Sequence, residues 1–135
     1  EDLAVNEAIE KAASDAYKQA GVGPKDVDVA ELHDCANINE VLCLEGSGLF
    51  KRGEGVYSAA ERRTYFDGDI PVGLSGGLKT RGHPVGATGA YQLCEVTRQL
   101  RGDWAGKKSR SPEVGLTVNV GGTGTVVTAH VLRKR

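Results

Sequence analysis

The chain has 135 residues, with 17 basic side chains, 18 acidic side chains and a formal net charge of −1 at pH 7. This length fits a single domain, residues 1–135, that can bury a core of its own. The balanced charge gives no reason to expect nucleic acid or an anionic membrane as a partner. No apolar run approaches the roughly 20 residues of a membrane span and no signal peptide opens the sequence, so we expect a cytoplasmic protein.

Cysteine and glycine usage narrows the class further. The three cysteines, Cys35, Cys43 and Cys94, are odd in number and form no CxxC, which argues against a disulfide framework or a zinc ribbon. Glycine accounts for 19 residues, about twice its usual ~7% share, and this surplus indicates backbone that approaches a ligand closely. Because methionine is absent and the sequence begins at Glu1, we expect it to be a piece of a longer protein.

The first half predicts a helix, a strand, a second helix and a long loop. Apolar residues at helical spacing fill residues 2–20, and Gly21 ends that helix. VDVAEL at 27–32 predicts a short buried strand, which delivers His33, Asp34 and Cys35 at its carboxyl end. A second helix follows from Ala36 to about Glu45 with Asp34 as its N-terminal cap, and residues 50–70 lack a sustained period and predict a surface loop.

The second half is organised around the glycine-rich stretch SGGLKTRGHPVGATG at 75–89. Pro84 suits the first turn of a helix, and helical spacing then continues to Leu100 and stops at Gly102. The runs 114–120 and 125–132 are rich in β-branched residues and predict two strands joined by a GGTG reversal. This order predicts an α/β domain with a layered mixed sheet and helices packed on it, and ligands gather at the carboxyl ends of parallel strands in such domains.

Candidate functional residues stand at the ends of these strands and loops. His83 precedes the predicted helix start, where unpaired N–H groups favour a neutral imidazole that can act as a general base. His33 and Cys35 follow the first strand, and Asn119 and Gly121 lie in the last hairpin. A thiol, an imidazole and backbone N–H donors are the equipment of acyl transfer.

The alternatives for these residues are structural. His83 can cap its own helix, and His33 and Cys35 can mark a buried strand end, since free cysteine behaves as a small hydrophobe. Cys43 and Cys94 fall on apolar helix faces and are expected in the core, whereas His130 is expected to be structural or exposed. We expect no metal, because His33, Asp34 and Cys35 lack the spacing of known ligand sets.

Three motifs carry a resemblance to a known family. GHPVGATG at 82–89 looks like the histidine motif of thiolases. HDC at 33–35, followed by NINE, resembles the corresponding motif of the sterol-carrier-protein-type thiolases and their archaeal acetyl-CoA acetyltransferase relatives. GLTVNVGGTG at 115–124 is similar to the closing hairpin of that branch. The motifs keep their order over nearly the whole chain, which resembles the C-terminal half of a thiolase and implies a thiolase-fold half-domain.

The resemblance implies roles by position. His83 would activate a nucleophilic cysteine, and His33 would replace the asparagine that helps to hold a catalytic water or oxyanion. The hairpin lacks the usual second cysteine and reads Asn119, Val120, Gly121, so Cys35 would supply the acid/base group and Gly121 an oxyanion N–H. Four residues are expected to bind the substrate or stabilise the oxyanion, namely Gly121, Asn119, Gly76 and Gly77.

The implied activity is thiolysis of a 3-ketoacyl-CoA or the reverse Claisen condensation, with coenzyme A thioesters as substrates and no covalently bound cofactor. The nucleophilic cysteine belongs to the N-terminal half, which nothing here matches, so this chain alone should lack turnover. The implied partners are that missing half, a second copy in a homodimer and a zinc-containing OB-fold acyl-CoA-binding protein. Ala36 stands where the family usually has phenylalanine. The alternatives are a thiolase-fold retro-aldolase, in which tyrosines replace the histidines, and a non-catalytic scaffold subunit.

Overall fold

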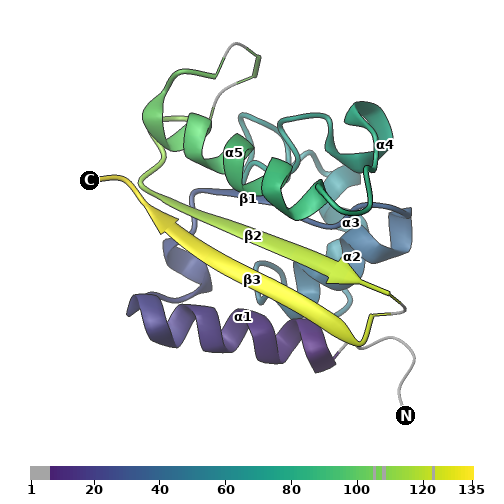
Figure 1. Cartoon of the computed structure of the whole chain (residues 1–135). Coiled ribbons are helices and arrows are strands. Elements are labelled where there is room, and N and C mark those ends of the chain that lie inside the picture. Colours follow the sequence, from purple (N-terminus) through teal and green to yellow (C-terminus); the bar gives the residue numbers. More distant parts are fainter. Residues whose placement is uncertain (1–6, 105, 108, 123) are drawn as a thin grey trace.

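A small mixed sheet between two helices forms the centre of the molecule (Figure 1). The computed structural model describes residues 7–104, 106–107, 109–122 and 124–135. Helices α1 and α5 cover opposite faces of the sheet, and the shorter helices lie beyond the end of the sheet where β1 and β2 finish. The elements in chain order are α1 Glu7–Ala20, the 3-10 turn η1 Pro24–Asp26, β1 Val29–Glu31, α2 Asn37–Gly46, α3 Gly55–Ala60, α4 Gly77–Arg81, α5 Thr88–Arg101, β2 Val114–Gly121 and β3 Val126–Arg133.

The sheet has the strand order β1-β2-β3. β1 runs parallel to β2, with Ala30 opposite Leu116, and β2 runs antiparallel to β3 from Val114–Arg133 to Gly121–Val126. An isolated parallel bridge between Ala30 and Val72 continues the pairing on the far side of β1. The predicted mixed sheet is confirmed, and the carboxyl ends of β1 and β2 lie at the same edge.

Side chains along β2 point alternately to the two faces of the sheet, so one apolar cluster forms against α1 and another against α5. Val114, Leu116, Val118 and Val120 belong to the larger core, which also holds Ile9 of α1. The opposite face of the sheet packs against α5 through a smaller cluster of Val29, Val96 and Leu100. This two-sided burial fixes the register of β2, because a slip of one residue would exchange the two faces.

Gly115 allows α5 to approach the sheet. A Cβ atom built on Gly115 would overlap the side chain of Val96, and it would also contact Val29. The residue is buried in the middle layer, so neither strand nor helix can move aside cheaply. Glycine at this position therefore sets the distance between α5 and β2.

We predict that Gly115→Ala lowers the free energy of unfolding by about 1–3 kcal/mol through overpacking. Combining it with Val96→Ala should cost less than the sum of the two single changes, because the second change removes the atoms that clash. Urea unfolding of the four proteins measures this coupling. Gly86→Ala is the control, since a Cβ there meets nothing within 4 Å, and strictly additive energies would contradict the packing argument.

The long helices and strands follow the sequence expectations. The strands at 114–120 and 125–132 and the helix at 36–45 are confirmed within one residue. The first helix is confirmed from Glu7, and the remainder of the predicted range 2–20 lies outside the described residues. The last long helix ends at its predicted stop, where Gly102 adopts a left-handed conformation (φ 75°).

Two expectations about the shorter elements were wrong, and one short helix, α4, was not anticipated. The predicted loop at 50–70 contains α3, which is held by tertiary contacts such as the hydrogen bond from the Gly55 amide to Glu45 Oε1 (2.9 Å). The glycine-rich stretch contains α4. The helix expected to begin at Pro84 begins at Thr88 instead, because residues 84–87 form a turn in which Pro84 O accepts the amides of Ala87 and Thr88.

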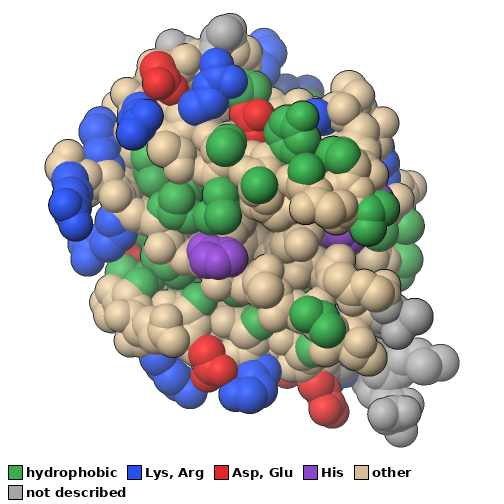
Figure 2. Space-filling model, viewed as in Figure 1, with side chains coloured by type: hydrophobic (Ala, Val, Ile, Leu, Met, Phe, Trp, Pro, Cys, Tyr) green, Lys and Arg blue, Asp and Glu red, His purple; other side chains and the backbone are tan. Residues whose placement is uncertain are grey.

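One further expectation, the burial of Cys94, was wrong. Cys94, expected in the core, is exposed on α5, whereas Cys43 is buried as expected. His130 is exposed on β3, in agreement with its predicted structural or surface role. Apolar side chains gather over α5 in Figure 2, and most lysine and arginine side chains lie toward the periphery of this face. None of the helices within the described ranges is long and apolar enough to cross a membrane.

Candidate active site

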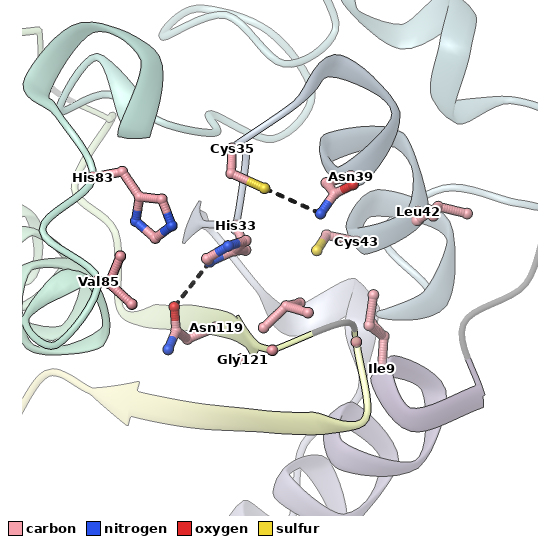
Figure 3. A pocket seen from close by; sticks show the side chains of 13 residues that line it. Ile9, His33, Cys35, Asn39, Leu42, Cys43, His83, Val85, Asn119 and Gly121 are labelled. Atoms are coloured by element: carbon pink, nitrogen blue, oxygen red, sulfur yellow. Dashed lines mark hydrogen bonds between the residues drawn. The ribbon is translucent and has the colours of Figure 1, made fainter.

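A cavity of about 600 Å³ opens where β1 and β2 end. Its polar lining consists of His33, Cys35, Asn39, His83 and Asn119 (Figure 3). The remaining lining is apolar or glycine and comes from α1, α2, the 82–87 turn and the β2–β3 hairpin, namely Ile9, Leu42, Cys43, Val85, Val120, Gly121, Gly122 and Gly124. The cavity thus combines a few polar groups with apolar walls, as small-molecule sites usually do.

The two histidines meet at this cavity. Their ring centroids lie 5.1 Å apart with an interplanar angle of 82°. His33 is nearly buried, with 4% of its surface exposed, whereas His83 is exposed at the mouth. Burial lowers the pKa of His33, and the neighbouring His83 lowers it further. The buried ring therefore stays neutral at physiological pH.

Hydrogen bonds fix the tautomer of each ring. Asn119 Oδ1 accepts from His33 Nδ1 at 2.9 Å, so the His33 Nε2 atom is left without a proton. Thr88 Oγ1 lies 2.7 Å from His83 Nδ1 and donates its own hydrogen to Pro84 O (3.1 Å), so the hydroxyl accepts the imidazole proton. His83 Nε2 is therefore the free base of that ring.

The thiols in the lining differ in accessibility. Cys35 is exposed, and its Sγ atom accepts a hydrogen bond from Asn39 Nδ2 at 3.2 Å. Cys43 is fully buried, and burial raises the pKa of its thiol to about 12. Proton transfer and covalent chemistry require an accessible thiol. Of the two, Cys35 is the one suited to react with a ligand.

The predicted oxyanion and substrate residues separate into two groups. Asn119 and Gly121 line the cavity with the histidines. Gly76 and Gly77 do not, and they line a different, smaller pocket beside α4. The reason for glycine at 77 is local, because its φ is +63° and a Cβ there would overlap the carboxylate of Asp34.

Asp34 has a different role from the one expected. We predicted it as the N-cap of α2, but that helix has Ala36 as its N-cap and no side-chain cap bond. Asp34 Oδ1 instead accepts the amide of Leu78 at 2.8 Å, in the first turn of α4. This contact joins the end of β1 to the glycine-rich loop.

Glu31 is a functional candidate that sequence reasoning missed. It is 1% exposed and accepts two hydrogen bonds from Ser75, one from the amide (3.1 Å) and one from the hydroxyl (2.8 Å). Ser75 Oγ in turn accepts the amide of Gly77 at 3.2 Å. Burial raises the pKa of Glu31 to about 7, although the Ser75 hydrogen bonds act in the opposite direction. A glutamate inside an otherwise apolar strand was the available signal.

Glu31 should make stability depend on pH. Its pKa of about 7 in the folded chain exceeds the ordinary value of 4.5, so the folded state retains the proton more strongly and stability falls as pH rises from about 4.5 to about 7. Glu31→Gln should remove at most about 3 kcal/mol of this pH-dependent change. Urea unfolding at pH 5 and pH 8 measures it, with Glu10→Gln on the exposed face of α1 as control. Equal pH dependence in Glu31→Gln and the unmodified chain would refute the assignment.

No group of three or more histidine, cysteine or acidic side chains is placed to hold a metal ion, within the ranges that the structure describes. The site instead offers two imidazoles and one accessible thiol near the carboxyl ends of the parallel strands β1 and β2. Imidazole and thiol side chains are suited to proton transfer and covalent chemistry.

The family follows from a direct match. A model described as "Thiolase C-terminal domain-like" matches residues 1–134. The chain therefore belongs to the thiolase family as a C-terminal domain, and the resemblance seen in the three motifs is confirmed.

Individual relatives agree with this assignment. The chain is 44% identical to an acetyl-CoA acetyltransferase of Methanothermobacter thermautotrophicus, covering 98% of this chain and 35% of the relative. It is 40% identical to sterol carrier protein 2 of Rattus norvegicus, covering 89% of this chain and 22% of the relative. A solved structure, the "Ltp2-ChsH2(DUF35) aldolase", matches 93% of this chain and 31% of its own with a TM-score of 0.79 and 25% identity. The chain thus spans about a third of the acetyltransferase and of the aldolase, and less than a quarter of sterol carrier protein 2.

Proposed function

We propose that this chain is the histidine-bearing half of an acyl-CoA C-acyltransferase, which cleaves 3-ketoacyl-CoA or condenses two acyl-CoA thioesters. The observation that carries the proposal is the convergence of His33, His83 and Cys35 on one cavity of about 600 Å³. These residues come from segments 48 positions apart in the sequence. The acetyl-CoA acetyltransferase relatives support a thioester as the substrate.

His83 is the proposed base for the nucleophile. Its Nε2 atom is the unprotonated nitrogen, because Nδ1 donates to Thr88. Val85, on the same turn, lines the cavity and is 83% exposed, so the cavity is open on this side. A nucleophilic cysteine and a thioester can therefore approach His83 from outside the chain.

His33 and the hairpin form the proposed oxyanion region. Asn119 holds the His33 ring by its Nδ1 atom, and the other ring nitrogen is available to a water or a protonated partner. Gly121 lies in the lining with no side chain between its backbone and the cavity. A water bonded to His33 Nε2 has a second hydrogen to donate, and preorganised donors of this kind stabilise charge that develops on a thioester oxygen.

Cys35 is the proposed acid/base at the α-carbon. In cleavage, a cysteine thiolate of the missing half attacks the 3-keto carbon and the bond between C2 and C3 breaks. The electron pair passes to C2 as an enolate, and the Cys35 thiol supplies the proton. A coenzyme A thiol then takes the acyl group from the nucleophile, and condensation follows the same steps in reverse.

The complete site requires a further segment. The chain covers about a third of its acetyltransferase relatives, and no residue here matches the thiolase nucleophile, so we propose the N-terminal half as the necessary partner. A homodimer and a zinc-containing OB-fold acyl-CoA-binding protein are further proposed partners. The three cysteines are free thiols, which supports a reducing compartment such as the cytoplasm.

A carbon–carbon lyase is the second candidate, because the structural neighbour is named an aldolase. The retained imidazoles of His33 and His83 favour thiolase chemistry over it. Parallel assays of acetoacetyl-CoA thiolysis and of retro-aldol cleavage with the complete protein separate the two functions. A third possibility, a scaffold subunit, would show neither activity even with the partner half present.

Cys35→Ala tests the proposed mechanism in the complete protein. Both thiolysis and condensation should fall by about 10²–10⁴-fold, since general acid–base groups typically contribute that much. Cys94→Ala, which removes an exposed thiol that does not line the cavity, should leave the rates unchanged. If the two rates survive Cys35→Ala, the acid/base assignment is wrong.

A further inference from the structure

Asn39 is the side chain that contacts the reactive sulfur of Cys35. Its Nδ2 atom lies 3.2 Å from Sγ and donates a hydrogen bond to it. Both residues line the same cavity, and Figure 3 shows the amide of Asn39 directed at the thiol. A donor that remains bonded to sulfur favours the thiolate over the thiol.

The fold fixes the position of this amide. Cys35 lies immediately before Ala36, the N-cap of α2, and Asn39 lies in the first turn, four residues after the cysteine. The backbone amide of Asn39 bonds to Ala36 O at 3.0 Å, which ties the donor to the helix start. The positive end of the α2 dipole also lies on this side, so helix and amide act on the sulfur in the same direction.

The charged side chains near Cys35 are of both signs. Asp34 is the preceding residue, and Glu40 is half-buried on α2, where burial and the Asp34 charge raise its pKa. Lys79 on α4 lowers the pKa of Glu40, and its own amino group bonds to Asn37.

The other titratable groups that line this cavity are His33, His83 and Cys43. The buried His33 ring stays neutral for the reason given above, and the high pKa of the Cys43 thiol keeps it protonated. Asn39 is therefore a donor that supports a negative sulfur without bringing a charge into the cavity.

We propose that Asn39 is a positioning residue that stabilises the Cys35 thiolate during proton transfer at the α-carbon. The proposal rests on the acyltransferase function proposed above. In the condensation direction the Cys35 thiolate removes the α-proton, the S–H bond forms, the C–H bond breaks and its electron pair moves into the thioester enolate. The Asn39 N–H remains bonded to sulfur throughout and makes the charged form less costly.

Asn37 provides a matched control in the same turn. It is exposed, and its Oδ1 atom accepts from Lys79 Nζ instead of facing the thiol. Asn37→Asp places the same new carboxylate at the start of α2 as Asn39→Asp, so the pair separates the hydrogen bond to sulfur from a general change in helix-end charge.

The first measurement follows alkylation of Cys35 by iodoacetamide against pH in the purified protein, with the site assigned by peptide mass spectrometry. We expect Asn39→Ala to raise the pH midpoint by about one unit, which is about a tenfold loss of thiolate near neutral pH. The isosteric Asn39→Asp should raise it further, because a carboxylate replaces the donor. Asn37→Asp should leave it within a few tenths of a unit. Equal midpoints in the Asn39 and Asn37 variants would overturn the proposal.

The second measurement is deuterium exchange at the α-carbon of acetyl-CoA by the complete protein. Asn39→Ala should lower the exchange rate about tenfold at neutral pH and lose less at high pH, where the thiolate forms without help. A shifted alkylation profile with unchanged exchange would overturn the positioning role and leave the acyltransferase function intact. Exchange that survives Cys35→Ala would instead overturn the proposed acid/base function, on which the Asn39 role depends.

Discussion

The carboxylates at the end of β1 hold the glycine-rich loop, and the site depends on this contact. Glu31 accepts two hydrogen bonds from Ser75, and Asp34 accepts the Leu78 amide. These bonds satisfy backbone donors in a loop that has little apolar surface of its own to bury. The loop continues into the turn that carries His83, and the strand continues into His33. One set of hydrogen bonds therefore places both imidazoles, although 49 residues separate them in the sequence.

The electrostatics of the site also depend on His33, whose imidazole has to remain neutral. A charged His33 would be costly at 4% exposure, and burial lowers its pKa accordingly. Asn119 is an uncharged partner, so it fixes the His33 tautomer without the strong pKa increase that a carboxylate would cause. The acidic side chains of this region point elsewhere, since Glu31 and Asp34 are bound to the loop. The cavity can therefore receive an anion or an enolate without a carboxylate in direct opposition.

Sequence periodicity predicted the long helices and strands, whose apolar residues recur at regular spacing. The β-branched runs of β2 and β3 and the apolar stripes of α1, α2 and α5 were sufficient to predict these elements. The motifs were sufficient to select five residues that the structure brings to one cavity, namely His33, Cys35, His83, Asn119 and Gly121. The failures occurred where tertiary contacts decide. α4 has five residues and depends on Asp34 for its N-terminus. Gly76 and Gly77, predicted as substrate-binding positions, lie outside the lining of the histidine cavity, and the group that approaches Gly77 is a carboxylate of the chain itself. Cys94 faces outward because buried Gln92, Glu95 and Val96 occupy the inner face of α5.

The side chain at position 119 of the hairpin orients a histidine and supplies no thiol. The hairpin has asparagine at 119, and this side chain holds the ring of His33. A cysteine at 119 could not make that hydrogen bond at the same reach, and the buried imidazole would lose the acceptor that fixes its tautomer. With the hairpin position used for orientation, the accessible thiol of the cavity comes from another element. Cys35 meets this requirement because it follows β1 by four residues and lies at the start of α2, where Asn39 is available to bond its sulfur.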